Sequence, residues 1–68
     1  MAKMTFGEKI RHHRVKLHLT QTELGEKAGV STSSIAEYEM DKREPKFFAV
    51  ICLADALGVS LNYLAGKE

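Results

Sequence analysis

The sequence contains one cysteine, one proline and no tryptophan, and its 68 residues carry a formal net charge of only +1. One cysteine cannot form an internal disulfide, and Cys52 lies in an apolar stretch where a small core residue is expected. No stretch is long enough to span a membrane, because Asp55 interrupts the longest apolar one, residues 47–59. The N-terminal residues lack the layout of a secretory signal. We therefore expect a reducing, cytoplasmic environment and no membrane contact.

The chain also lacks the residue combinations of enzymes and metal sites. Its three histidines, His12, His13 and His18, occur without a second cysteine and without the spacing of a zinc-binding helix. We interpret them as solvated helix surface. The sequence has no pairing of a nucleophile with a base, no glycine-rich phosphate loop and no acidic dyad. It therefore predicts no enzyme, no metal, no cofactor and no small-molecule ligand.

A chain of this length buries only one core, so we expect a single domain over residues 1–68. Glycines, the proline and N-capping residues divide it into five short helices without any strand pattern, at residues 5–17, 21–28, 32 to 39 or 40, 46–57 and 61–64. Thr5 with Glu8, and Thr20 with Glu23, have capping-box spacing. Ser31 suits the N-cap of the third helix. The pattern predicts a compact all-α fold.

Helical spacing also indicates which side chains face the core. The expected inward positions are Phe6, Ile10, Arg14 and Leu17 in the first helix, and Phe48, Ile51, Cys52 and Leu53 or Ala54 in the fourth. Arg14 is the one charged member of its stripe. We expect it to form a structural ion pair with Glu39, which would join the first helix to the third.

Residues 20–39 have the pattern of a helix-turn-helix. Gly29 suits the turn, and Gly25 provides the small residue needed where two steeply crossing helices approach each other. Leu24, Val30 and Ile35 would form the apolar wedge that holds the crossing angle. The opposite face of the third helix is then free to enter a groove about 12 Å wide, the width of the DNA major groove.

The residues on that free face are small or polar. We interpret Thr32, Ser33 and Glu37 as base contacts, because hydroxyls and a carboxylate can hydrogen-bond base edges. The expected phosphate contacts are Gln21 and Thr20 at the start of the second helix, Ser34, and the basic pair Lys42 and Arg43. A simpler alternative remains for each of them. Hydroxyls near a helix start often serve as local caps, and loop cations are often only solvated.

Four strings of this sequence, FGEKIRHHR, LTQTELGEKAGVSTSSIAEYE, KREP and LADALGVSLNYL, resemble the helix-turn-helix domains of phage repressors and Cro proteins, the XRE-like family. The resemblance covers residues 6–65 and implies a five-helix lambda-repressor-like DNA-binding domain. It implies that Gln21 binds phosphate and braces the third helix, and that Thr32, Ser33 and Glu37 contact bases. Asp41 departs from the family's frequent glycine and would tolerate left-handed geometry less easily.

The sequence thus predicts a transcription regulator that binds double-stranded DNA, a repressor acting as a homodimer on a palindromic operator. Residues Leu61, Tyr63 and Leu64 of the last helix offer one self-association surface, unless they belong entirely to the core. The competing hypothesis is an antitoxin-like helical module that binds another protein, with DNA binding secondary. The low net charge supports that alternative.

Overall fold

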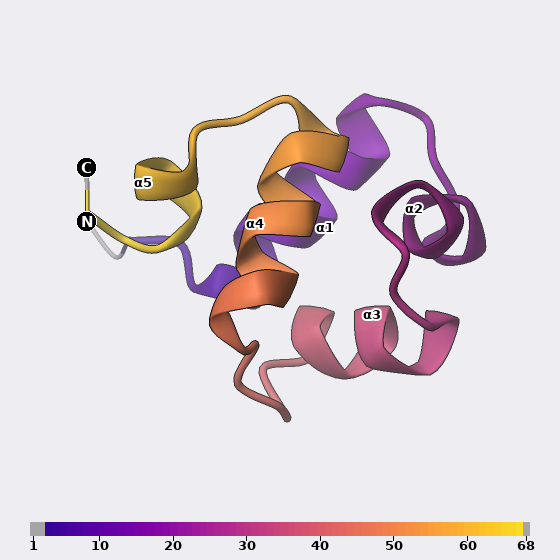
Figure 1. Ribbon diagram of the computed structural model, residues 1–68, viewed down its shortest axis with the longest axis horizontal. Helices are drawn as coiled ribbons and strands as arrows, with labels where there is room; N and C mark the ends of the chain where they lie inside the picture. The colour runs from indigo at the N-terminus through magenta and orange to yellow at the C-terminus, as the bar shows by residue number, and fades with distance from the viewer. Residues whose placement is uncertain (1–2, 68) are drawn as a thin grey trace.

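The computed structural model describes residues 3–67, which form five helices and no strand. The helices are α1 (Phe6–Lys16), α2 (Gln21–Ala28), α3 (Thr32–Glu39), α4 (Phe47–Leu57) and α5 (Leu61–Leu64). Figure 1 shows α4 at the centre against α1, with α2 and α3 on one side and α5 on the other. The predicted all-α architecture is confirmed, and the helix bounds differ from the predicted ones only by one residue at each end of α1 and at the start of α4.

Side chains cap four of the five helices. Thr5 and Thr20 each accept a hydrogen bond from the backbone N–H of the glutamate three residues later, and that glutamate bonds back to the cap. Ser31 and Ser60 cap α3 and α5, because each hydroxyl accepts a hydrogen bond from the backbone N–H three residues later. The two capping boxes and the Ser31 cap predicted from the sequence are confirmed. They fix where each short helix begins, which matters because helices of this length are marginal on their own.

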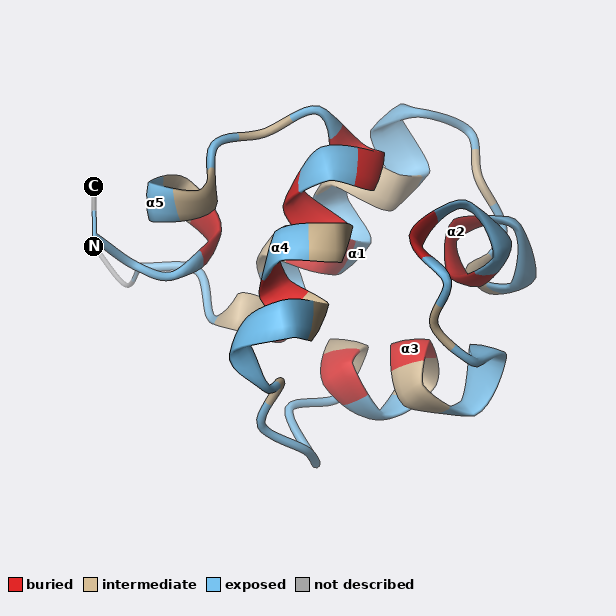
Figure 2. Ribbon diagram, viewed as in Figure 1, coloured by how far each residue is buried: buried red, intermediate tan, exposed pale blue. Residues whose placement is uncertain are grey.

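Each helix contributes one fully buried side chain to a common core, namely Ile10, Leu24, Ile35, Leu53 and Leu64. Figure 2 shows the buried segments of all five helices turned toward the centre of the molecule. Tyr38 joins this core from α3 and packs edge-to-face on Phe6 of α1, with ring centroids 5.9 Å apart. The core therefore holds the inner face of α3 and leaves its outer face to solvent.

Three residues predicted to face the core do not. Phe48 is 75% exposed, Ile51 is 37% exposed, and Leu17 is 45% exposed because α1 ends one residue before it. In α4 every residue except Asp55 is apolar, so helical periodicity cannot identify the inward face. The core instead takes Val50, Leu53, Ala54, Ala56 and Leu57 from this helix. The apolar residues at its start are left on the surface.

The last helix packs onto the core rather than offering a free apolar face. Leu64 is buried, and Leu61 packs against the core cluster. Tyr63 is half-buried between side chains of α1: Lys9 lies over its ring, and its hydroxyl lies 3.0 Å from Nε2 of His13. The sequence left open whether these residues form a self-association surface or belong to the core, and Leu64 belongs to the core. Cys52 is half-buried against the core, as expected for a small apolar residue.

Candidate nucleic-acid interface

The turn between α2 and α3 depends on two glycines. Gly29 ends α2 with φ 71°, a left-handed conformation that glycine adopts without steric cost. A Cβ on Gly25 would lie 2.4 Å from the carbonyl oxygen of Val30, so only glycine allows this approach. In Figure 1, α2 is seen nearly end-on while α3 runs across the view, so the two axes are steeply inclined. The chain thus contains a helix-turn-helix arrangement at α2 and α3.

The three side chains predicted to contact bases lie on the solvent side of α3. Thr32, Ser33 and Glu37 are exposed, whereas Ile35 and Tyr38 on the other side are buried. The Thr32 hydroxyl lies 3.3 Å from the hydroxyl of Thr22 in α2, which links the starts of the two helices. Thr22 was not predicted from the sequence, because it belongs to none of the motifs found there. The face presents hydroxyl and carboxylate groups on a rigid support.

Glu37 does not stand alone on this face. Nη1 of Arg43 lies 3.2 Å from Oε1 of Glu37 and donates a second hydrogen bond, 3.0 Å long, to Oγ of Ser34. Both charged side chains are about half exposed. The pair offsets the repulsion that a lone glutamate would exert on phosphate. The sequence suggested roles for Arg43, Ser34 and Glu37 separately, and the structure brings the three together.

Arg14 and Glu39 form a largely buried ion pair behind α3. Nε of Arg14 lies 2.6 Å from Oε2 of Glu39 and Nη2 lies 3.1 Å from Oε1, while Nη1 donates to the carbonyl of Leu19. The two side chains are 14% and 4% exposed. Gln21 donates a further hydrogen bond of 3.1 Å to the same carboxylate. These contacts connect the end of α1, the start of α2 and the end of α3.

The other predicted phosphate contacts lie at the two borders of α3. Thr20 is exposed at the start of α2, where its hydroxyl caps the helix. Gln21 is half-buried, and its amide N–H donates a hydrogen bond to the Glu39 carboxylate. Lys42 is exposed just beyond α3, and its backbone N–H donates to the carbonyl of Glu37. Hydroxyl, amide and ammonium groups therefore flank the exposed face on both sides.

Asp41 provides the connection that sequence reasoning missed. Its φ is 55°, the left-handed geometry that aspartate was expected to tolerate less easily than glycine. Its carboxylate accepts hydrogen bonds from the Thr5 hydroxyl at 2.7 Å and from the Gly7 N–H at 3.0 Å. A glycine at this position could make neither bond. Asp41 thus ties the loop that follows α3 to the positive N-terminal end of α1.

Two kinds of site are absent from residues 3–67. No group of three histidine, cysteine, aspartate or glutamate side chains there could hold a metal ion. No helix of that part of the chain is long and apolar enough to cross a membrane. His12 and His13 instead stack edge-to-face with ring centroids 5.0 Å apart. Burial and the nearby charges of His12 and Lys16 lower the pKa of His13 from its usual 6.5.

Residues 10–64 match the model of a protein family described as helix-turn-helix. This chain belongs to that helix-turn-helix family. The immunity repressor protein of Bacillus phage phi105 is 37% identical to this helix-turn-helix chain over 65 residues, which cover 96% of the chain and 45% of the relative. Repressor protein C2 of Salmonella phage P22 is 40% identical over 58 residues, covering 85% of this chain and 27% of that protein. The resemblance to phage repressors is confirmed.

Two solved structures show the same fold bound to DNA. The P22 c2 repressor in complex with a synthetic operator superposes with a TM-score of 0.90 at 35% identity, covering 97% of this helix-turn-helix chain and all of that one. SinR, a regulator of biofilm formation solved with DNA, superposes with a TM-score of 0.85 at 27% identity, covering 90% of this chain and 98% of that one. These proteins are regulators and not enzymes, in agreement with the prediction from the sequence.

The helix-turn-helix chain spans about half the length of the curated relatives it matches first, between 45% and 54%. The shared part is the five-helix domain. The regions that those relatives possess beyond it have no counterpart among these residues.

Proposed function

We propose that this domain binds double-stranded DNA sequence-specifically and regulates transcription in the cytoplasm, as a repressor that occupies a palindromic operator as a homodimer. The observation that carries the proposal is the exposed polar face of α3, held rigid by the core behind it and flanked by Thr20, Gln21, Lys42 and Arg43. The relatives named as repressors, and those solved on DNA, support it.

In this proposal α3 lies in the major groove. Thr32, Ser33 and Glu37 contact base edges through two hydroxyls and one carboxylate, which accepts from cytosine N4. Thr20, Gln21, Ser34, Lys42 and Arg43 contact the phosphates on either side and hold the helix in register. Arg14 and Glu39 take no part in reading bases. Their ion pair holds α3 at the angle that this docking requires.

The charge distribution supports this division of roles. Residues 20–39 contain four glutamates against Lys27 alone, so the helix-turn-helix does not attract DNA strongly by net charge. The basic residues lie before and after it. Non-specific affinity is therefore low, and more of the binding free energy depends on the contacts that α3 makes with bases.

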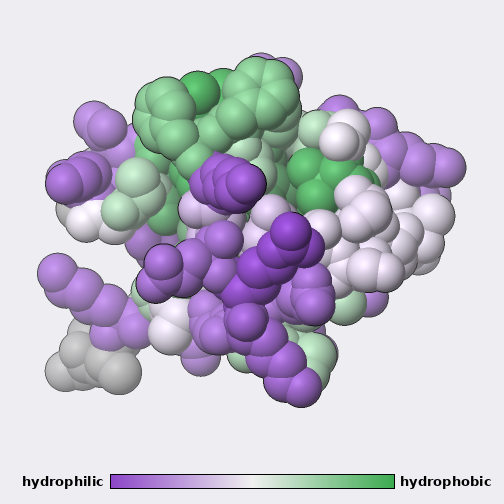
Figure 3. All heavy atoms as spheres, turned by 60° about the horizontal axis from the view of Figure 1, so that its bottom comes forward, coloured by the Kyte–Doolittle hydropathy of each residue, from purple (hydrophilic) through white to green (hydrophobic). Residues whose placement is uncertain are grey.

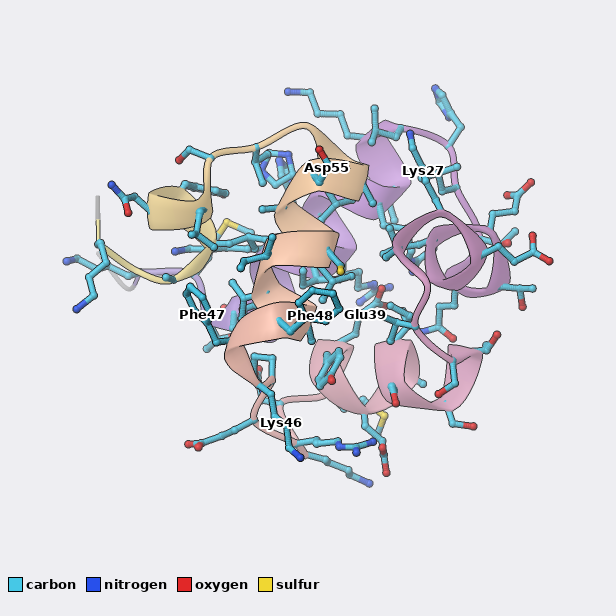
Figure 4. All side chains as sticks on the ribbon, in the orientation of Figure 1. Lys27, Glu39, Lys46, Phe47, Phe48 and Asp55 are labelled. Atoms are coloured by element: carbon cyan, nitrogen blue, oxygen red, sulfur yellow. The ribbon has the colours of Figure 1, made fainter. Side chains whose placement is uncertain are left out.

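The direct test is a selection of bound duplexes from a random pool, followed by fluorescence anisotropy of the enriched duplex across salt concentrations. We expect one enriched motif, and a slope of log affinity against log salt that Lys42→Ala and Arg43→Ala each reduce by about one. Lys27→Ala is the matched control, because Lys27 is exposed on the side of α2 that faces away from α3 (Figure 4). A flat slope with no enriched motif would instead favour the protein-binding module.

A further inference from the structure

Arg43 lies beside the exposed face of α3 because the chain makes a tight turn where that helix ends. Asp41 has left-handed geometry, and the backbone N–H of Lys42 donates a 2.9 Å hydrogen bond to the carbonyl of Glu37. This pattern is a Schellman turn, which holds the loop against the end of the helix. Figure 3 brings this side of the molecule forward and shows strongly hydrophilic side chains at its centre, beside a region of intermediate hydropathy. The turn therefore places Arg43 next to Glu37.

The guanidinium of Arg43 uses only one of its three nitrogen atoms within the domain. Nη1 donates to Oγ of Ser34 at 3.0 Å and to Oε1 of Glu37 at 3.2 Å, which occupies both of its N–H groups. Nε and Nη2 form no hydrogen bond among residues 3–67. These two nitrogens make the edge of the fork that binds a phosphate or carboxylate through two parallel bonds. Arg43 can therefore hold Glu37 and a phosphate at the same time.

Ser34 connects the guanidinium to the start of the same helix. Its Oγ lies 3.0 Å from Oγ of Ser31, the N-cap residue of α3, and accepts from Arg43 on its other side. A chain of hydrogen bonds thus runs along α3 from its N-cap through Ser34 and Arg43 to Glu37. Because each link restricts the next, the Arg43 side chain is held before any DNA arrives, and less rotamer entropy is lost on binding.

Glu37 is the one charged residue among the three predicted base contacts, and it needs a second donor in a groove. A carboxylate that enters the major groove loses water and approaches phosphates of its own charge, which is unfavourable without compensation. The amino group of cytosine N4 supplies a hydrogen bond to one carboxylate oxygen. Arg43 supplies a positive charge and a donor to the other, since its contact with Glu37 uses Oε1 and leaves Oε2 to the base.

We propose that Arg43 is a positioning residue that determines how strongly Glu37 selects cytosine. One edge of its guanidinium holds Oε1 of Glu37, the other binds a DNA phosphate, and Oε2 of Glu37 accepts from cytosine N4. The inference rests on the proposed function, because it concerns the same face of α3. It gives Arg43 a second role. Loss of an ordinary phosphate contact weakens binding to all sequences alike, whereas loss of Arg43 also weakens the preference for one base.

The first experiment measures base discrimination, the ratio of affinities for the enriched duplex and for one with the base pair read by Glu37 replaced. Repeating the selection with Glu37→Ala locates that base pair, because the preference is lost there. We expect wild type to discriminate by about tenfold or more, and Arg43→Ala to discriminate several-fold less. Lys42→Ala is the matched control, since Lys42 is an exposed neighbouring cation without a carboxylate partner among residues 3–67. It should bind both duplexes more weakly and keep the wild-type ratio.

The second experiment uses Arg43→Lys to separate charge from bridging. Lysine keeps the positive charge, so the slope of log affinity against log salt should equal that of wild type. An ammonium is a point charge without a second edge, so discrimination should fall as far as in Arg43→Ala. In the Glu37→Ala background, Arg43→Ala should have no further effect on discrimination, because the two residues act as one unit.

Thermal melting of each variant should match wild type, since an ion pair of two half-exposed side chains contributes little to stability. Wild-type discrimination in Arg43→Ala or Arg43→Lys would overturn the inference and leave sequence-specific binding intact. A base preference that Glu37→Ala leaves unchanged at every position would do the same. A selection that enriches no motif would overturn the proposed function and this inference together.

Discussion

Replacing Arg14 with alanine is expected to destabilise the domain more than any other single loss of charge. The Glu39 side chain is only 4% exposed, and among the described residues 3–67 the substitution leaves its carboxylate with the amide of Gln21 as side-chain donor. It also removes the hydrogen bond from Nη1 to the carbonyl of Leu19. A buried charge that loses its partner costs about 3–5 kcal/mol, because desolvation is no longer offset by the ion pair.

That loss is a large part of the free energy of unfolding of a chain of this size. At roughly 0.05–0.15 kcal/mol per residue, a domain this small is stable by about 3–10 kcal/mol. Arg14→Ala is therefore expected to be partly unfolded at room temperature. Lys16→Ala changes an exposed residue at the end of α1, two residues after Arg14; it is the matched control and should cost less than about 0.5 kcal/mol.

Urea unfolding followed by far-ultraviolet circular dichroism measures both variants. The double variant Arg14→Met with Glu39→Met removes both charges, so it separates the loss of the attraction from the cost of leaving the buried Glu39 carboxylate unpaired. Replacing a whole buried pair by apolar residues is often nearly neutral, so the double variant should be more stable than Arg14→Ala. A free energy of unfolding for Arg14→Ala within about 0.5 kcal/mol of wild type would refute the reasoning.

Three further changes test other parts of the fold. Gly25→Ala places a methyl group 2.4 Å from the Val30 carbonyl oxygen and should cost about 1–3 kcal/mol in urea unfolding; an unchanged midpoint would contradict the close approach. Asp41→Ala should be less stable than Asp41→Gly by about 1 kcal/mol, since both lose the carboxylate but only alanine keeps the left-handed strain. Because the pKa of His13 is lowered in the fold, its protonation opposes folding, and the melting temperature should fall as the pH drops below 6.5. The melting temperature of His13→Gln should fall less over the same pH range.

Local structure was easier to predict from the sequence than which face of each helix is buried. The capping boxes at Thr5 and Thr20 and the turn at Gly29 are specified by residues within four positions of each other, so their geometry follows from short-range chemistry. The inward face of α4 does not, because an almost wholly apolar helix has no polar side to mark the surface. Phe48 was therefore assigned to the core, although the structure exposes it.

The candidate interface shows the same division. The predicted face of Thr32, Ser33 and Glu37 follows from one helix, and its exposure could be foreseen from the buried positions of Ile35 and Tyr38. The contacts that cross between elements could be foreseen only in part. The ion pair of Arg14 with Glu39 was expected, while the links of Arg43 to Ser34 and Glu37, and of Asp41 to α1, depend on loop conformation that no periodic pattern encodes.

These contacts hold α3 in place, which is what the proposed interface requires. The inner side of α3 is held by the core, its end by Glu39, and the loop after it by Asp41 and Arg43. Side chains on the outer face are thereby presented on a rigid support, which reduces the conformational entropy lost on binding. The base recognition proposed for two hydroxyls and one carboxylate depends on that rigidity, since a base contact discriminates by only about 1–3 kcal/mol.

The measurement that tests this account most directly is the change in amide NMR signals when the duplex enriched by selection is added to the labelled protein. The account predicts that the largest shifts fall on residues 32–37 of α3 and on the flanking residues 20, 21, 42 and 43. Shifts confined to α5 and the exposed side of α1, with α3 unchanged, would contradict it.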